Sequence, residues 1–159
     1  MVAMVQPHQN ALIDVRILLL RGEDVLMTQL SAGRFNGRWN VPGGHASPGE
    51  DVLSASVREV REEVGLGVQP EDLVFSSVSH HRPPTRSEKV TFTFSSRSFT
   101  GEPYAAEPDR AAVVRWMSLD DLPAALMPQA AVSLKLFRQE ELFHTYGLGG
   151  VSGLEAGGD

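Results

Sequence analysis

Three glutamates in one short segment are the residues of this sequence whose types and spacing best fit chemistry. Glu59, Glu62 and Glu63 are spaced at i, i+3 and i+4, which brings them to one face if the segment is helical. Mg²⁺ takes oxygen ligands in octahedral geometry and is usually bound by a few carboxylates, waters and substrate phosphates. The triplet therefore indicates either a hard-cation site or a solvated acidic face that Arg58 and Arg61 partly neutralise.

A helix over residues 51–64 would present all three carboxylates together. The segment contains neither proline nor glycine. Its apolar residues recur at steps of four, three and four, namely Leu53, Val57, Val60 and Val64. This spacing is typical of the buried face of an α-helix. Two starts are open, a capping box of Ser47 with Glu50 or a cap at Asp51, and Gly65 predicts the end.

Strands are expected on both sides of this helix. Apolar and alternating residues predict strands at 11–20, 25–30, 39–41, 73–80, 89–99 and 111–117. A short helix is expected at 120–125, and a last helix begins at Pro128 with Phe143 on its buried face. Mixed strands with one central and one C-terminal helix predict an α/β protein of three layers.

The length of the chain, 159 residues, fits one domain with a single core. We expect this domain to span residues 10–146, between a flexible N-terminus at residues 1–9 and a disordered, glycine-rich tail at residues 147–159. The absence of cysteine excludes disulfides, thiolate metal sites and a cysteine nucleophile.

Charge and hydropathy narrow the classes of partner. The 20 acidic and 14 basic side chains give a net charge of -6, which disfavours non-specific binding to nucleic acid. No segment approaches the roughly 20 consecutive apolar residues that a membrane-spanning helix needs. Residues 1–10 lack the positive cluster and the apolar region of a secretory signal. We therefore expect a cytoplasmic protein without a membrane or nucleic-acid partner.

The glutamates belong to a longer pattern of Gly44, five residues, Glu50, seven residues and then the segment 58–66. This pattern resembles the Nudix box, GX5EX7REUXEEXGU with U apolar, and matches it at every position. Flanking segments also resemble bacterial MutT-like members, so the resemblance spans about residues 11–140. One departure is Ser47, where many relatives have glutamate, and it lies outside the fixed letters. The resemblance implies the Nudix fold, a three-layer α/β/α sandwich with a mixed central sheet.

The chemistry that the resemblance implies is hydrolysis of a pyrophosphate bond in a nucleoside diphosphate linked to another group X, with Mg²⁺ or Mn²⁺ as cofactor. Cations neutralise the pyrophosphate oxygens and orient a water, which supplies most of what catalysis needs. By position in the box, Glu59, Glu62 and Glu63 are the implied metal ligands, with the carbonyl of Gly44 as a further ligand. Arg58 is implied to orient Glu59 through charge-assisted hydrogen bonds, against the alternative of a surface pair with Glu62.

The general base stays open at this point. Glu107 follows the segment 101–103, Gly-Glu-Pro, where some MutT-like members carry an acid that binds metal or acts as the base. The alternatives are a box glutamate as the base and an ordinary loop role for Glu107. Glu50 is expected to organise the junction between the loop and the helix.

Four residues outside the box are candidate substrate-binding residues, namely Arg34, Arg38, Trp39 and His81. Each arginine is either a phosphate ligand or a solvated loop residue. Trp39 either lines the mouth of a pocket or packs in the core. His80 and His81 are adjacent on a strand and point to opposite faces, so at most one of them contacts substrate.

The Nudix box indicates a site for pyrophosphate and metal, but it does not indicate the chemical identity of the group X. By elimination we expect a small-molecule nucleotide as the partner, a nucleoside triphosphate or a related nucleotide, with ADP-ribose or a nucleotide sugar as the alternative. Leu126 and Met127 stand where some purine-specific members carry an asparagine, which disfavours oxidised guanine nucleotides. A non-catalytic Nudix binding module is the alternative class, and the complete set of box glutamates argues against it. Many relatives form homodimers, and the sequence leaves the oligomeric state open.

Overall fold

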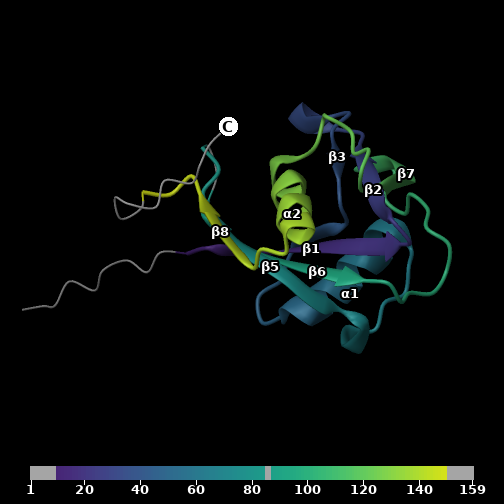
Figure 1. The fold of residues 1–159 in the computed structure, drawn as a ribbon, viewed down its shortest axis with the longest axis horizontal. Helices are drawn as coiled ribbons and strands as arrows, with labels where there is room; N and C mark the ends of the chain where they lie inside the picture. Colours follow the sequence, from purple (N-terminus) through teal and green to yellow (C-terminus); the bar gives the residue numbers. More distant parts are fainter. Residues whose placement is uncertain (1–9, 85–86, 150–159) are drawn as a thin grey trace, which may run out of the picture.

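The computed structural model describes residues 10–84 and 87–149, which form one mixed sheet with a helix on each face (Figure 1). The helices are α1 (Val52–Val64) and α2 (Pro128–Gln139). The eight strands of the sheet are β1 (Leu12–Arg21), β2 (Asp24–Leu30), β3 (Trp39–Asn40), β4 (Gly43–His45), β5 (Val74–His81), β6 (Lys89–Ser96), β7 (Ala111–Ser118) and β8 (Phe143–Tyr146).

The sheet has the strand order β3-β2-β1-β6-β5-β8, with β4 paired to β1 and β7 paired to β2. The pairs β1–β6 and β5–β8 are parallel, whereas the other neighbours run antiparallel. The mixed sheet between two helices confirms the predicted three-layer α/β/α arrangement. Strand β1 lies at its centre and begins beside β4, so the start of β1 is where the sheet meets the segment that precedes α1.

Strand β1 is buried on both faces because a helix covers each of them. Ile17 and Leu19 belong to a core with Val60 of α1, whereas Leu18 belongs to a second core with Leu134 of α2. Alternate residues of a strand point to opposite faces, so a doubly covered strand reads as a continuous apolar run rather than an alternating one. This explains the run of apolar residues that fills the second half of β1.

Most of the elements expected from the sequence are confirmed within one or two residues, apart from the strand expected at 89–99, which ends at Ser96. Two expectations near the C-terminus are wrong. Residues 120–125 are irregular, with one turn and two bends, rather than helical, and Pro123 in this segment has no backbone N–H to donate. Phe143 does not extend the buried face of the last helix, since α2 ends at Gln139 and Phe143 lies on β8 with 62% of its surface exposed.

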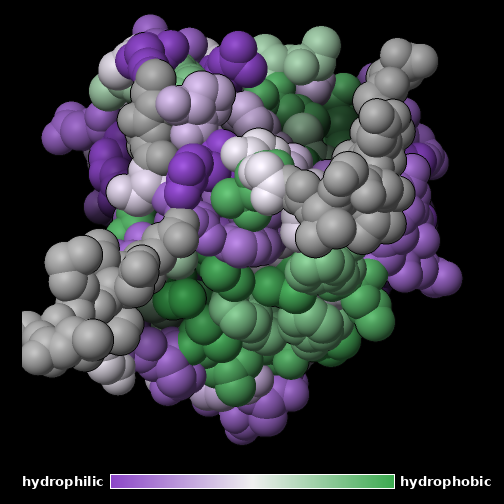
Figure 2. All heavy atoms as spheres, turned by 90° about the vertical axis from the view of Figure 1, so that its left-hand side faces the viewer, coloured by the Kyte–Doolittle hydropathy of each residue, from purple (hydrophilic) through white to green (hydrophobic). Residues whose placement is uncertain are grey.

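The β8 side of the molecule carries several exposed apolar side chains. Hydrophobic residues gather over much of the face that Figure 2 turns toward the viewer, the side on which β8 lies. The exposed apolar residues of β5, β8 and the turn before β8 are Val74, Phe75, Leu142 and Phe143. Neither helix in the described residues is long and apolar enough to cross a membrane. The expected flexible N-terminus and most of the expected tail lie outside the described residues.

Candidate active site

The N-terminus of α1 is capped by Asp51 rather than by a capping box of Ser47 with Glu50, the other helix start considered from the sequence. Its carboxylate accepts hydrogen bonds from the backbone N–H groups of Leu53 and Ser54 at 3.0 and 2.9 Å. Such a cap satisfies donors that the first turn of a helix leaves without partners. Of the expected apolar stripe, Val60 and Val64 are buried in the core, whereas Leu53 in the first turn is exposed. Glu59 and Glu63 lie against the glycines of β4.

Glu50 therefore does not cap the helix and instead anchors an arginine. It accepts hydrogen bonds from Nε and Nη2 of Arg58 at 2.8 and 2.9 Å, and from the backbone N–H of Ser47 at 2.8 Å. The hydrogen bonds from Arg58 lower the pKa of Glu50 to about 2. Glu50 thus ties the loop before α1 to the middle of the helix, as expected for a residue that organises this junction.

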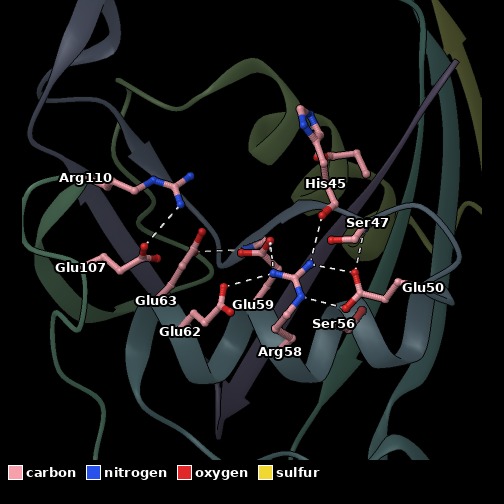
Figure 3. Close-up of polar contacts among 12 residues, drawn as sticks. His45, Ser47, Glu50, Ser56, Arg58, Glu59, Glu62, Glu63, Glu107 and Arg110 are labelled. Atoms are coloured by element: carbon pink, nitrogen blue, oxygen red, sulfur yellow. Dashed lines mark hydrogen bonds and ion pairs between the residues drawn. The ribbon is translucent and has the colours of Figure 1, made fainter. Parts of the chain in front are cut away.

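Arg58 joins four parts of the site (Figure 3). Besides Glu50, its Nη1 donates to Glu59 Oε1 at 3.0 Å and to Glu62 Oε2 at 3.1 Å. Its Nη2 donates to the backbone carbonyl of His45 on β4 at 3.1 Å. Hydrogen bonds between ionised partners are stronger than neutral ones, so this arginine holds the carboxylates in fixed directions. The geometry combines both roles considered from the sequence, the orientation of Glu59 and the pair with Glu62.

The two glycines of β4 let the carboxylates of α1 approach the sheet. The backbone N–H of Gly43 donates to Glu63 Oε2 at 3.2 Å. A Cβ atom on Gly43 would lie 2.0 Å from the carbonyl oxygen of Val15, so no side chain fits there. Glu59 lies against Gly44 and is only 6% exposed. Glycine permits such close approach because it has no Cβ atom.

Burial shapes the electrostatics of the two inner glutamates. Desolvation raises the pKa of Glu63 to about 7, and it also raises the pKa of Glu59 above its ordinary value. The neighbouring carboxylate raises the pKa of Glu63 further, because like charges oppose ionisation, whereas Arg16 of β1 lowers it. The two carboxylates therefore form a site that a positive charge would stabilise.

A loop before β7 brings Glu107 to the same place. The backbone N–H groups of Tyr104 and Ala106 donate to the carbonyls of Val64 and Glu63, both at 3.1 Å, and so dock the loop on the C-terminal end of α1. Oε2 of Glu107 lies 3.5 Å from Nη1 of Arg110. Its other oxygen, Oε1, is buried and has no hydrogen-bond partner among the described residues. Figure 3 shows Glu107 and Arg110 beside Glu63.

One cavity opens beside these carboxylates, and a second adjoins it. The first, of about 230 Å³, is lined by Glu59, Glu63 and Glu107 together with charged residues of β1, β6 and the loop before β7. The second, of about 290 Å³, has mainly apolar and aromatic walls. Four residues line both cavities: Phe35, Lys89, Met127 and Gln129. An acidic pocket next to an apolar one fits a ligand with a charged end and a flat ring.

Comparison with known families agrees with this geometry. The NUDIX domain matches residues 11–138, which is most of the chain. The chain belongs to the Nudix hydrolase family. The matched region contains α1, the glycines of β4 and the loop that carries Glu107.

Individual Nudix relatives are similar to this chain over different spans. The crystal structure of a MutT NUDIX hydrolase from Burkholderia pseudomallei has a TM-score of 0.74 and 26% identity, and the match covers 80% of this chain and 98% of that one. The 8-oxo-dGDP phosphatase NUDT18 from Homo sapiens is 35% identical over 85 residues, 54% of this chain and 24% of that protein. The NAD-capped RNA hydrolase NudC from Stutzerimonas stutzeri is 30% identical over 109 residues, 68% of this chain and 37% of that protein. The chain thus matches only about a quarter to about a third of the lengths of these last two relatives.

Among the candidate substrate-binding residues of this Nudix domain, Arg34 and His81 line the second cavity. The His81 ring is fully buried, stacks on Tyr146 with ring centres 4.5 Å apart, and has no hydrogen-bond partner for either nitrogen within the described chain. Arg38 and Trp39 do not line either cavity. Arg38 donates to the carbonyl of Leu126 at 3.0 Å, and Trp39 packs in the core beside α2.

Four charged residues of the first cavity were missed from the sequence, namely Asp14, Arg16, Lys89 and Arg110. A signal for the first two was present. Asp14 and Arg16 are two residues apart in a strand whose other residues from Leu12 to Leu20 are apolar, so both point to the same face and neither fits a purely structural strand. Lys89 stands at the start of β6 and carried no comparable signal.

The residues of the site fit the divalent cation that Nudix hydrolases use. Glu59 and Glu63 offer carboxylate oxygens at a place where burial raises the pKa of both groups, so that a cation would stabilise their ionised forms. Across the described residues, no three acidic or histidine side chains already converge as a closed metal cage. Mg²⁺ usually keeps several waters and takes substrate phosphates as ligands, so it needs only a few carboxylates of the protein.

Proposed function

We propose that this chain is a metal-dependent pyrophosphohydrolase that cleaves a nucleoside diphosphate linked to a group X, with a nucleoside triphosphate or a related nucleotide as substrate. The observation that carries the proposal is the set of glutamates around one cavity. Glu59 and Glu63 of α1 line it together with Glu107 of the loop, and Glu107 Oε1 has no hydrogen-bond partner in the described part of the chain. A buried polar atom without a hydrogen-bond partner is costly and is characteristic of functional sites.

The metal would be Mg²⁺ or Mn²⁺, and Glu59, Glu62, Glu63 and the carbonyl of Gly44 would hold it. When bound, the ion would neutralise the pyrophosphate oxygens and make the attacking water more acidic. Arg58 contributes by fixing Glu59 and Glu62 in position through its shared Nη1 group. Preorganised carboxylates need no rearrangement at the moment of reaction.

Glu107 is our candidate for the general base. Its unpartnered Oε1 would accept the proton of the water that attacks phosphorus, while the bond from phosphorus to the leaving phosphate oxygen breaks. Arg110 lies close to the other oxygen of Glu107 and would hold the carboxylate in its direction. A box glutamate is the alternative base, and the Glu107→Gln variant separates the two, since it should lose turnover while keeping metal affinity.

The second cavity is the proposed site of the nucleoside. Its walls include Phe35, Pro83, Met127 and Tyr146, which offer apolar surface to a flat base. Arg34 lies at the same cavity and is a candidate ligand for a phosphate, although its guanidinium also stacks on Phe35 with 4.5 Å between the guanidinium carbon and the ring centre. A charged and an apolar cavity side by side support a nucleotide rather than an inorganic polyphosphate.

The test is cleavage of a substrate panel with Mg²⁺, with Mn²⁺ and with EDTA. The panel contains nucleoside triphosphates, ADP-ribose, nucleotide sugars and NADH. It also contains 8-oxo-dGTP, 8-oxo-dGDP and NAD-capped RNA, because relatives are named for such substrates. We expect metal-dependent release of phosphate or pyrophosphate from one class of nucleotide. Failure to cleave any member, with Mg²⁺ binding demonstrated by calorimetry, would support the non-catalytic binding module instead.

A further inference from the structure

A buried ion pair on β1 lies in the wall of the acidic cavity and outside the Nudix box. The Asp14 side chain is fully buried and that of Arg16 is 8% exposed. Nε and Nη2 of Arg16 donate to the two carboxylate oxygens of Asp14 at 3.0 and 3.1 Å. Thr91 of β6 donates a further hydrogen bond to Asp14 at 3.2 Å. Asp14 is thus held from two strands, and it fixes the guanidinium of Arg16.

Stability alone does not account for this pair. Desolvation of two charges offsets most of their attraction, and a well-packed apolar pair of similar volume is often as stable or more stable. The next residue on the same face of β1 shows that apolar side chains fit this face of the strand, because Leu18 is fully buried in the core with α2. A charged pair at this position therefore needs a ligand to explain it.

Arg16 has hydrogen-bond donors left for such a ligand. The two bonds to Asp14 use Nε and one hydrogen of Nη2, whereas a guanidinium has five donors. No hydrogen bond from Nη1 to an acceptor is present within the described residues, and Arg16 lines the first cavity beside Glu59 and Glu63. The free edge of a fixed guanidinium matches two oxygens of one phosphoryl group.

We propose that Arg16, held by Asp14, binds a phosphoryl group of the substrate at the wall of the acidic cavity. Arg16 is the binding residue, and Asp14 is a positioning residue that acts through it. The ligand is a phosphoryl group rather than a base because Arg16 lines the cavity of the glutamates and does not line the apolar one. The inference rests on the proposed function and adds a phosphate contact that the box does not contain.

The experiment measures binding of inorganic pyrophosphate in Mg²⁺ buffer by calorimetry, together with KM and kcat for the best substrate of the panel. The Arg16→Lys variant keeps the positive charge and loses the two parallel N–H donors of the guanidinium. We expect it to weaken pyrophosphate binding and to raise KM about tenfold, with kcat within about threefold of the parent. Asp14→Asn should show a smaller change in the same direction, because it loosens Arg16 without removing it. The matched control is Arg97→Lys, since Arg97 is an exposed arginine that donates to the carbonyl of Gly22.

A folded Arg16→Lys variant with the pyrophosphate affinity and KM of the parent would overturn the inference. A loss confined to kcat would overturn it too, because a merely structural role lowers the active fraction without changing affinity. If Arg16→Lys does not fold, the double variant of Asp14→Asn with Arg16→Gln takes its place, because it leaves no unpaired buried charge. This double variant must then show the loss of pyrophosphate binding. Pyrophosphate binding is measured without turnover, so these outcomes are separate from the failure of the parent to cleave the panel.

Discussion

The carboxylate of Glu59 fills the space that a side chain at Gly44 would occupy. A Cβ atom on Gly44 would lie 2.4 Å from Oε1 and 2.7 Å from Cδ of Glu59. Glu59 has little freedom to retreat, because it is 6% exposed and Arg58 holds Oε1 at 3.0 Å. The glycine of the Nudix box is therefore needed for the position of the glutamate, whatever its carbonyl binds.

Gly44→Ala should displace Glu59 and reduce turnover by roughly a hundredfold, since displacement of a reacting group by about 1 Å has effects of this size. Overpacking should also lower stability by about 1–3 kcal/mol. Steady-state kinetics and urea unfolding check both results.

The control for added volume is Gly22→Ala in the turn between β1 and β2. Gly22 has φ +59°, and no atom lies within 4 Å of the place that a methyl group would take, so the variant suffers backbone strain alone. It should lose about 1–2 kcal/mol of stability and keep the turnover of the parent. Equal turnover in Gly44→Ala and Gly22→Ala would contradict the argument for Glu59.

Glu62→Gln should abolish most turnover and leave the fold intact. The Glu62 side chain is 46% exposed and contacts Arg58 rather than the core, so the amide is tolerated structurally. Loss of one metal ligand should lower kcat by about a hundredfold or more at saturating Mg²⁺. The matched control is Glu71→Gln at an exposed turn, which should behave as the parent. Comparable kcat in Glu62→Gln and the parent would remove Glu62 from the proposed metal ligands.

Glu63→Gln should stabilise the metal-free protein at pH 8. Burial raises the pKa of Glu63 to about 7, above its ordinary value of 4.5, so the ionised form is less stable in the folded state than in the unfolded state. The parent in EDTA therefore loses stability as the pH rises from about 4.5 through 7, and the variant escapes this loss. The gain at pH 8 should be about 1–3 kcal/mol in urea unfolding, and little or no gain is expected at pH 4.5.

In EDTA at pH 8 the Glu63→Gln variant should be more stable than the parent, and Mg²⁺ should reverse this order of stability. Metal removal is therefore a second test of Glu63. A cation that binds only the folded state adds stability that grows with its concentration. The parent should gain stability with Mg²⁺ at pH 8, whereas Glu63→Gln should gain much less. A variant that is stabilised by Mg²⁺ as strongly as the parent would show that Glu63 is not a metal ligand.

The parts of this fold that were predictable from the sequence are those that local patterns determine. Helical spacing predicted α1, the burial of Val60 and Val64 and the gathering of the glutamates, although Leu53 of the expected stripe is exposed. The cap at Asp51 was one of two local options. Strand β8 was missed because its four residues form a strand only through pairing with β5, which is distant in sequence. Strand β4 was missed because two of its three residues are glycines, which are depleted in strands.

The parts of the site outside the box depend on contacts between distant segments. Arg38 and Trp39 flank the site in sequence, yet a short strand turns Trp39 into the core, where it is 9% exposed. Asp14 and Arg16 reach the cavity only because β4 pairs with the start of β1. The motif therefore predicted which residues provide the carboxylates, whereas the pairing of distant strands decides which basic side chains lie beside them.

His81 should make the protein less stable in mild acid. It is fully buried against Tyr146, and desolvation lowers its pKa to about 4 from an ordinary value of 6.5. The charges that act on it are Asp14, which favours the protonated ring, and Lys89, Arg16 and His80, which oppose it. The unfolded chain binds this proton below about pH 6.5 and the folded protein does not, so stability should fall as the pH drops from 6.5 toward 4.

The comparison of the parent with His81→Gln isolates the contribution of His81 to the pH dependence of stability, because the carboxylates that titrate in the same range are present in both proteins. Urea unfolding at pH 7.5 and pH 4.5 should show that the parent loses about 2–3 kcal/mol more than the variant over this interval. His144→Gln on the same edge of the sheet is the control and should lose as much as the parent. Equal losses of stability in the parent and His81→Gln would contradict the prediction, because they would mean that protonation of the buried ring costs nothing. That would require a hydrogen-bond acceptor beside His81, and none is present among the described residues.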